Sequence, residues 1–538
     1  MSTPADSRIV LRGGSIPHAD GVRRADLAVQ NGRIRAVGEV DRRADDLVID
    51  AGDRLLLPGF VDAHSHADGL LGDPEVQLAL LRQGVTTIIA GQDGVSYPPG
   101  DGAYATDYFA AINGPHPAYR GDGVAGYLSS VDDAGPLNAA CLVPAGTVRF
   151  EVCGRDEAPA TPEQTVAMTA LVESGLAEGA VGLSTGLDYV PGIFQQASEI
   201  AALCHPVARS GGVYVTHLRG GYEANTAAGI AEVAEIARLT AAATGAELPV
   251  HVSHFHADAP IVLDQLDKLA TAGLSATFDA YPYVRGCSLL AMPLLPHALS
   301  ARPLPQVLAA LTDPDRRPAL RQSCLARVTT SASLGTGWAE MITLAHVAAP
   351  EFSWTHGFSL RQAAARVEAE PIDLALDLLA AARLEVNVVM AVPHERGPAE
   401  LARIFSRPEH VGGSDGIFIG AHPHPRARGS FARYLREFVR EQQSWTWSDA
   451  VAHLASHPVD RFALGERGRI RVGSVADLLV IDPHTVADTA TYDQPLGLSV
   501  GIDDVLVAGT PVLRDGELTG AHPGRGLRRT RTHQIFPQ

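Results

Sequence analysis

The chain has 538 residues, of which 46% are hydrophobic and 19% charged, values that are ordinary for a globular protein. Its 61 acidic and 43 basic residues give a formal net charge of −18. This excess of acid argues against nucleic acid as a partner, because phosphate binding needs a basic face. A chain of this length is too long for one simple core and indicates a large domain with additions.

The cysteines point to a reducing compartment. There are five, an odd number without a Cys-x-x-Cys pair, at Cys141, Cys153, Cys204, Cys287 and Cys324. This pattern argues against a disulfide framework. The N-terminus lacks the basic-then-apolar pattern of a signal peptide, and no apolar run reaches the length of about 18 residues that a membrane span requires. We therefore expect a cytoplasmic protein without a membrane partner.

The two ends of the chain share a pattern of short strands separated by turns. In the first part the candidate strands are 9–11, 26–29, 34–37 and 47–50, and near the other end they are 468–470, 476–481 and 503–509. This shared texture predicts that residues 1–57 and 470–538 pair into one small sheet domain.

The middle of the chain, residues 58–469, alternates compact apolar strands with Ala- and Leu-rich helical stretches. Eight candidate strands are 60–64, 86–90, 140–143, 180–183, 213–217, 250–254, 276–280 and 411–415. Repeated strand–helix units imply a parallel sheet, and eight of them suggest an α/β fold of the closed (β/α)8 TIM barrel type. A ninth candidate, 386–390, competes for a place, and the pattern leaves open which one is extra. The Pro- and Ala-rich segment 286–343 is long for a loop and predicts an inserted subdomain.

Metal-capable residues end the candidate strands one after another. His64 and His66 follow an apolar run, and on a strand residues at i and i+2 point to the same side. The His-x-His spacing alone is weak, because the chain has 21 histidines and three such pairs. The other strand ends carry Asp93, His217, His254 and Asp415. Each of these has an ordinary structural reading as a core histidine or a turn aspartate, but their shared position at barrel strand ends indicates a metal centre.

These motifs make the chain similar to the amidohydrolase superfamily and, within it, to the D-aminoacylase (N-acyl-D-amino-acid deacylase) family. The matching segments are PGFVDAHSHAD at 58–68, GLSTGLDYVPG at 182–192, YVTHLRGG at 214–221, HVSHFH at 251–256, FDAYPY at 278–283, GGSDG at 412–416, HPRARGSF at 424–431 and ADLLVIDPHTVADTATYDQP at 476–495. The resemblance implies a barrel with a small β-sandwich built from both chain ends.

The resemblance also implies a site for one or two zinc ions. His64 and His66 then hold one metal position and His217 and His254 the other, while Asp415 stands near the first as a ligand and as the catalytic acid and base. D-aminoacylases have a cysteine where this chain has Asp93. A carboxylate is anionic and able to bridge two zinc ions, but it is a harder ligand than a thiolate.

The expected reaction is hydrolysis of an amide bond, giving a carboxylic acid and a free amino acid. Zinc lowers the pKa of a bound water toward ~7, so that hydroxide is available near neutral pH. Asp415 accepts the proton of the water and returns it to the departing amine. The expected substrate is an N-acyl-D-amino acid or a dipeptide that contains a D-residue.

Substrate binding requires donors for the α-carboxylate. Arg219 is a candidate because it lies two residues after His217. By family resemblance Tyr281 helps to bind this group, and Tyr283 of the same motif is a further candidate. Two family positions differ here, since the lysine becomes His256 and the serine becomes Cys287, and Arg285 is placed to compensate. The resemblance also puts His424 and Arg426 at the substrate entrance.

Two other functions stay open at this point. A cyclic-amide hydrolase or a deaminase shares the opening histidine pair on the same fold, although the DAYPY and HPR motifs weigh against both. A metal-free binding or scaffold protein is an alternative of another class, and the retention of four histidines and Asp415 weighs against it. The sequence does not fix the oligomeric state.

Overall fold

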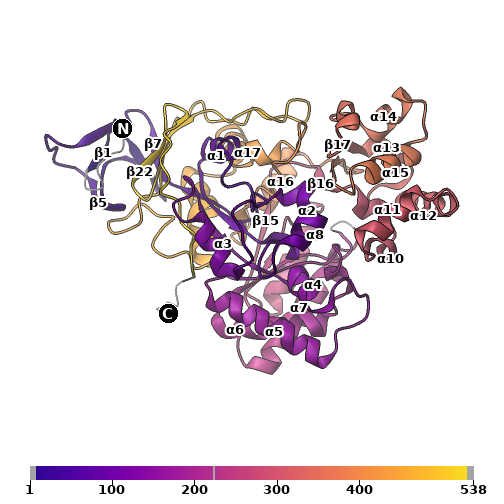
Figure 1. Cartoon of the computed structure of the whole chain (residues 1–538). Helices are drawn as coiled ribbons and strands as arrows, with labels where there is room; N and C mark the ends of the chain where they lie inside the picture. The colour runs from indigo at the N-terminus through magenta and orange to yellow at the C-terminus, as the bar shows by residue number, and fades with distance from the viewer. Residues whose placement is uncertain (1–7, 222–223, 530–538) are drawn as a thin grey trace.

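Strands from both ends of the chain pair with each other at the left of Figure 1. The computed structural model describes residues 8–221 and 224–529. One sheet has the order β5-β4-β1-β6 and the other the order β23-β22-β21-β20-β7-β2-β3. Their bounds are β1 Ile9–Arg12, β2 Ser15–His18, β3 Gly21–Arg24, β4 Asp26–Gln30, β5 Arg33–Gly38, β6 Leu47–Asp50, β7 Leu55–Pro58, β20 Leu478–Ile481, β21 Ile502–Val507, β22 Thr510–Arg514 and β23 Glu517–Leu518.

Strand β7 connects these sheets to the rest of the molecule. It pairs antiparallel with β20 and parallel with β2. Successive side chains of a strand point to opposite faces, and both faces of β7 are buried. Leu55 and Leu57 belong to the large central core, whereas Leu56 belongs to the core of the terminal sheets. The strand leads directly into the segment that carries His64 and His66.

The middle of the chain forms parallel strands with apolar, buried side chains. One sheet has the order β10-β9-β8 and the other the order β11-β12-β13-β14-β15-β19. Their bounds are β8 Phe60–Asp62, β9 Val85–Ala90, β10 Asn138–Cys141, β11 Val143–Pro144, β12 Gly182–Gly186, β13 Val213–His217, β14 Val250–Val252, β15 Ala276–Ala280 and β19 His410–Gly412. Every pair within these two sheets is parallel.

Backbone hydrogen bonds also join the two parallel sheets. Val181 N donates to Cys141 O at 2.9 Å, and Asp415 N donates to His64 O at 2.8 Å. A parallel bridge between Ser65 and Gly416 follows at the second junction. Only Leu142 separates β10 from β11, so consecutive residues of the chain lead from one parallel sheet into the other.

Helices connect the parallel strands, as the sequence pattern predicts. The helices α5, α6 and α7 lie together at the lower side of Figure 1. Helix α5 begins at Pro162, and Thr161 and Gln164 form a reciprocal capping box that satisfies its first backbone donors. The bounds are α1 Pro74–Leu81, α2 Ala103–Asn113, α3 Gly123–Val131, α4 Ala145–Cys153, α5 Pro162–Ala177, α6 Ala197–Ser210, α7 Thr226–Thr244, α8 Ala259–Thr271, α16 Pro398–Phe405, α17 Arg426–Arg433, η5 Tyr434–Glu441, α18 Trp447–Val451, η6 Ala452–Ser456 and α19 His457–Arg461.

The segment from Gly286 to Met390 has its own sheet and lies at the right of Figure 1. Strands β16 (Gly286–Leu289), β17 (Ile342–Val347) and β18 (Val386–Met390) pair antiparallel in the order β16-β18-β17. The ninth candidate strand, 386–390, is β18. It has no partner in the parallel sheets, so it is the candidate that lies outside them. The segment predicted to end at residue 343 continues further, because residue 343 lies inside β17, which pairs with β18.

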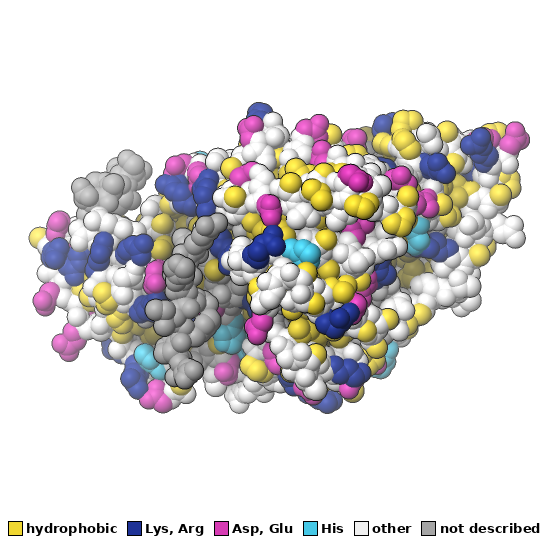
Figure 2. Space-filling view, turned by 90° about the horizontal axis from the view of Figure 1, so that it is seen from below, with side chains coloured by type: hydrophobic (Ala, Val, Ile, Leu, Met, Phe, Trp, Pro, Cys, Tyr) yellow, Lys and Arg dark blue, Asp and Glu magenta, His cyan; other side chains and the backbone are white. Residues whose placement is uncertain are grey.

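A separate core holds this segment together, with buried side chains from Leu290 to Val388. Its helices are α9 Ala291–Leu294, α10 His297–Ser300, α11 Leu304–Thr312, α12 Arg317–Thr330, α13 Trp338–Met341, α14 Leu360–Arg366 and α15 Pro371–Ala381. In the described part of the chain, no helix combines the length and the apolar character that crossing a bilayer requires. Figure 2 shows acidic and basic side chains interspersed over one face of the molecule.

Candidate metal centre and active-site cavity

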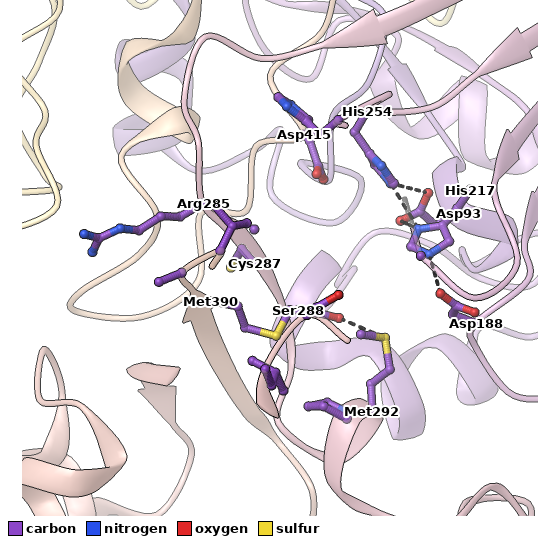
Figure 3. Close-up of a pocket in the computed structure, with 18 of the residues that line it drawn as sticks. Asp93, Asp188, His217, His254, Arg285, Cys287, Ser288, Met292, Met390 and Asp415 are labelled. Atoms are coloured by element: carbon purple, nitrogen blue, oxygen red, sulfur yellow. Dashed lines mark hydrogen bonds and ion pairs between the residues drawn. The ribbon is translucent and has the colours of Figure 1, made fainter. Parts of the chain in front are cut away.

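The six predicted ligands come together at the carboxyl ends of the parallel strands. Asp93 lies at the middle of the group, because its oxygens are 3.6 Å from His64 Nε2, 3.7 Å from His66 Nε2, 3.7 Å from His217 Nδ1 and 3.6 Å from His254 Nε2. Asp415 Oδ1 lies 3.3 Å from His66 Nε2 and 3.8 Å from His64 Nε2. Figure 3 shows Asp93, His217 and His254 close together with Asp415 nearby. The structure therefore assembles all six side chains, while their roles as ligands stay a prediction.

The chemistry of these atoms fits bound cations. Two sets of three ligand atoms lie within 4.8 Å of one another, one from His64, His66 and Asp415 and the other from His64, Asp93 and His254. His64 Nε2 and Asp93 Oδ1 are buried and have no hydrogen-bond partner among the described residues. Buried polar atoms are normally satisfied, and imidazole nitrogen with carboxylate oxygen is a donor set that zinc accepts. A cation between these atoms would supply the missing partner.

Three of the six residues adopt an unusual backbone conformation. The φ angles of Asp93, His254 and Asp415 are 54°, 32° and 49°. Residues other than glycine seldom adopt positive φ, and such strain is found where a structure holds functional side chains in place. Each of the three residues follows the end of a parallel strand, so the strained turn aims its side chain at the common centre.

A second partner orients each of three histidines. His66 Nδ1 lies 3.0 Å from Asn113 Oδ1, His64 Nδ1 lies 3.3 Å from Asp279 Oδ2, and His217 Nε2 lies 3.2 Å from Asp188 Oδ2. In each case the other ring nitrogen faces Asp93, namely His64 Nε2, His66 Nε2 and His217 Nδ1. An acceptor that takes the N–H of one ring nitrogen leaves the other nitrogen available to a cation. This is the arrangement in which outer partners fix metal-binding histidines.

Asp279 connects the two halves of the centre. Its carboxylate accepts from the backbone N–H of His254 at 2.9 Å and lies 2.9 Å from His251 Nε2, in addition to its contact with His64. Burial by itself would raise the pKa of Asp279, but the adjacent His64 and His251 outweigh it and lower the pKa below its ordinary value. Asp279 is therefore an anion that holds both strand ends.

Asp415 is paired with a buried arginine. Arg426 Nη1 lies 2.9 Å from Asp415 Oδ2, and its guanidinium carbon stands 4.5 Å from the centre of the Tyr281 ring. Burial would raise the pKa of Asp415, but the charges of Arg426 and His254 outweigh it and lower the pKa. Asp415 is thus ionised, with one oxygen toward the histidines and the other toward Arg426. Arg426 is fully buried and lines the cavity beside this centre.

A cavity of about 370 Å³ opens beside this centre. Four of the six predicted substrate-binding residues line it, namely His256, Tyr281, Arg285 and Cys287. His256 Nε2 accepts from the Tyr281 backbone N–H at 3.3 Å, and Cys287 Sγ donates to Asn387 Oδ1 at 2.9 Å. Arg285 pairs with Glu395 at 3.2 Å and stacks on Tyr492. Burial, followed by the charge of Arg396, lowers the pKa of His256 well below its ordinary value, so His256 is neutral.

The other two predicted substrate-binding residues lie outside the lining of the cavity. Arg219 bonds to Glu232 at 3.0 Å and to the carbonyl oxygens of Ile193 and Gln195 at 2.6 and 2.7 Å. The i, i+2 rule fails for Arg219 because β13 ends at His217. Tyr283 is buried and contacts Asp488 at 3.4 Å, and Arg433 covers its ring. Neither side chain lines the cavity, and their role in substrate binding stays a prediction.

Three further residues of the site were not singled out by spacing at the strand ends. Asp188 lies in a loop after β12 and Asn113 ends α2, so neither belongs to a pattern of metal ligands. Only the DAYPY motif could have indicated Asp279, because it lies at the end of a candidate strand.

Known proteins are similar to this chain in sequence and in fold. The sequence profile described as the amidohydrolase family matches residues 47–513. A D-aminoacylase of Alcaligenes xylosoxydans xylosoxydans is 30% identical over 98% of this chain and 99% of its own length, and an N-acyl-D-glutamate deacylase of the same organism is 31% identical over 97% and 96%.

A solved structure extends the likeness to the fold. It is the N-acyl-D-glutamate deacylase from Bordetella bronchiseptica, complexed with zinc and a phosphonate that mimics the tetrahedral intermediate of the reaction. It is 30% identical, has a TM-score of 0.78 and covers 97% of this chain and 99% of its own. The resemblance predicted from the motifs is confirmed. Because the profile spans most of the chain and these relatives align with it nearly from end to end, the chain belongs to the amidohydrolase family.

Proposed function

We propose that this chain uses zinc to hydrolyse the amide bond of N-acyl-D-amino acids, releasing a carboxylic acid and a free D-amino acid. One observation carries the proposal: four histidines and Asp415 surround Asp93, and two of the facing atoms are buried without hydrogen-bond partners in the described chain. The names of the relatives, D-aminoacylase and the deacylases of N-acyl-D-glutamate and N-acyl-D-aspartate, support this substrate class.

In this proposal the six side chains divide between two metal positions. His64, His66 and Asp415 hold the first, His217 and His254 hold the second, and Asp93 lies between them. Bound zinc supplies Lewis acidity and lowers the pKa of water at the site. Asp279, Asn113 and Asp188 keep the histidine rings oriented, so that the ligand atoms require little rearrangement.

Asp415 moves the proton of the reaction. Its depressed pKa keeps it ionised, so it is able to accept a proton from the attacking water. The carbon–nitrogen bond then breaks, and Asp415 returns the proton to the departing amine nitrogen. Arg426 compensates the charge of the carboxylate and fixes one of its oxygens, which leaves the other oxygen directed at the reacting groups.

The substrate carboxylate lies, in this proposal, near Arg426 and Tyr281. Arg426 is fully buried, and its Nε has no hydrogen-bond partner in the described part of the chain. A carboxylate is the natural partner for such a group. His256 is neutral and does not supply the charge of the family lysine. The buried Arg396 lines the same cavity and adds positive charge at this end.

The parallel strands support a closed (β/α)8 barrel as part of the same proposal. The bonds at Cys141 and at His64 join the two parallel sheets at both junctions. We assign residues 58–469 to the barrel, with Gly286 to Met390 as an inserted subdomain, and the two chain ends to a small β-sandwich. All five cysteines are free, which supports the proposed cytoplasmic location.

The test is an activity screen with zinc measured in the same preparation. Paired D- and L-N-acyl amino acids and dipeptides are compared with cyclic amides and with substrates that release ammonia. We expect acid and free amino acid from the D-compounds, and loss of turnover with a chelator that zinc reverses. Ring opening or ammonia release as the main activity would overturn the substrate assignment, and a folded protein that binds no zinc would overturn the mechanism.

A further inference from the structure

Arg327 lines the active-site cavity without a carboxylate partner. It lies in the last turn of α12, and its Nη2 donates to His297 Nε2 at 3.0 Å and to the carbonyl oxygen of Met292 at 3.4 Å. Its Nε is buried and has no hydrogen-bond partner among the described residues. Within residues 8–221 and 224–529, no Asp or Glu forms an ion pair with it. A partly buried guanidinium is normally paired with an anion.

The neighbouring arginines show the contrast. On the same helix, Arg317 pairs with Asp377 at 2.6 Å and Arg321 pairs with Asp373 at 2.9 Å. In the same cavity, Arg285 pairs with Glu395 and Arg426 pairs with Asp415. Each of these four arginines pairs with a carboxylate, whereas Arg327 pairs with none in the described part of the chain.

His297 does not neutralise this charge. Burial, and then the positive charge of Arg327, lower the pKa of His297 below its ordinary value. The imidazole is neutral and accepts the hydrogen bond through Nε2, so the pair keeps one full positive charge. A helix C-terminus does favour a basic residue, but that effect acts on the helix and leaves the buried Nε without a partner.

The surroundings of Arg327 suit a polar, anionic group. A second cavity of about 510 Å³ shares Arg327, Ser331 and Ser333 with the first. Its described lining includes the hydroxyls of Thr330, Ser331 and Ser333 and contains no Asp or Glu. Figure 3 places Met292, whose carbonyl oxygen accepts from Arg327, across the cavity from Asp415. Arg426 and Arg327 thus mark different sides of the site.

We propose that Arg327 binds a second carboxylate of the substrate, at a distance from the one that lies near Arg426. The preferred substrates are then N-acyl-D-amino acids with two carboxylates. The second carboxylate comes either from an acidic D-side chain or from the far end of a dicarboxylic acyl group. This inference rests on the proposed function and adds the charge of the preferred substrate to it.

The experiment compares substrates that differ by one carboxylate, using the full zinc-loaded chain. N-acetyl-D-leucine is the reference, N-acetyl-D-glutamate carries the extra carboxylate on the side chain, and N-succinyl-D-leucine carries it on the acyl group. The variants are Arg327→Gln and Arg327→Lys, with Arg321→Gln as the matched control because Arg321 is on the same helix and pairs with Asp373. Circular dichroism and zinc content verify that each variant is folded and loaded.

We expect one of the two dicarboxylates to have a higher kcat/KM than the reference. In Arg327→Gln the ratio of that kcat/KM to the reference value falls about 10- to 100-fold, the range for a lost hydrogen-bonded charge pair. Arg327→Lys retains part of the ratio, and Arg321→Gln retains all of it. The substrate whose ratio falls identifies the source of the second carboxylate.

Two results would overturn the inference, and they are distinguishable. If Arg327→Gln, folded and loaded with zinc, leaves both ratios unchanged while the D-amides are hydrolysed, the second-carboxylate site is refuted and the proposed function stands. If the wild-type protein hydrolyses none of the three amides, the proposed function fails and the inference fails with it.

Discussion

The Asp415 carboxylate has separate tasks for its two oxygens, and a single substitution tests them. Oδ1 faces His64 and His66, whereas Oδ2 pairs with Arg426. Asp415→Asn keeps the shape but cannot carry a proton between water and amine. We expect kcat to fall by about 10²- to 10⁴-fold, with zinc content retained through the histidines and Asp93.

A matched control for this variant is Asp488→Asn. Asp488 is a buried carboxylate that pairs with Arg436 at 2.7 Å outside the cavity. Steady-state kinetics and metal analysis are made on both proteins. Near-normal turnover of Asp415→Asn would refute the assigned proton transfer, and a similar loss in the control would point to a general effect of losing a buried charge.

Asp188 allows a test of histidine orientation without removing a ligand. Its Oδ2 lies 3.2 Å from His217 Nε2, and its Oδ1 accepts from the Gly220 N–H at 2.7 Å. Asp188→Asn weakens the hold on the ring, so we expect zinc affinity at the second position to fall about 10- to 100-fold. Competition with a chromophoric chelator measures this directly. The exposed Asp107→Asn is the control, and equal affinity in Asp188→Asn would contradict the orienting role.

Local sequence could reveal the candidate ligands of the site but not the residues that orient them. His64 and His66 stand two residues apart behind an apolar run, so local spacing indicates them. Asn113 is 47 residues from His66, and only the folded chain brings its amide to the ring. Arg219 shows the converse case, because local spacing pointed to the cavity, whereas its guanidinium bonds to Glu232 and is not part of the cavity lining.

At the level of elements, apolar runs located the strands but not their partners. The predicted ranges 213–217 and 276–280 agree with β13 and β15. The run 386–390 has the same texture, yet β18 pairs antiparallel outside the parallel sheets, because composition does not encode which strand lies alongside. β14 and β19 end at Val252 and Gly412, before the predicted ends. His254 and Asp415 thereby fall in strained turns that no periodicity indicates.

The helical element η6 contains a buried histidine that makes stability depend on pH. His453 stacks on Trp445 and donates through Nδ1 to the carbonyl oxygen of His410, the first residue of β19. Burial lowers the pKa of His453 from 6.5 to about 4. Between these values the unfolded chain binds the proton and the folded chain does not, so the stabilisation is complete above 6.5 and is lost as the pH falls toward about 4.

We expect this residue to account for up to about 3 kcal/mol of the acid destabilisation, at about 1.4 kcal/mol per pKa unit. The measurement is the free energy of unfolding in urea across this pH range. His453→Asn should flatten the dependence, whereas the exposed His484→Gln should leave it unchanged. An equally steep dependence in His453→Asn would show that other groups cause the acid destabilisation.

At the scale of the whole molecule, the two chain ends stabilise the segment that carries the first two histidines. β7 comes from the N-terminal part and β20 from the C-terminal part, and they pair next to the start of β8. Because both chain ends have short strands separated by turns, the sequence predicted one sheet domain built from the two ends. The sequence did not indicate that β7 has one face in each core, because a run of three leucines shows no alternation.

Because β7 contributes side chains to both cores, we expect the two cores to unfold together in one cooperative transition. Leu56 and Leu57 are both fully buried, in the terminal core and the central core respectively. Replacing either with alanine removes buried methyl groups and leaves a cavity, so we expect a loss of about 2–5 kcal/mol in the free energy of unfolding for each. Val22→Ala on the exposed edge strand β3 is the control and should change the free energy of unfolding by about 0.5 kcal/mol or less.

Denaturation followed by circular dichroism and by zinc release should give one shared midpoint in every variant, since the strand that links the cores also leads to His64. A Leu56→Ala protein that loses the terminal sheets in a separate early transition, with zinc still bound, would show that the two cores fold independently.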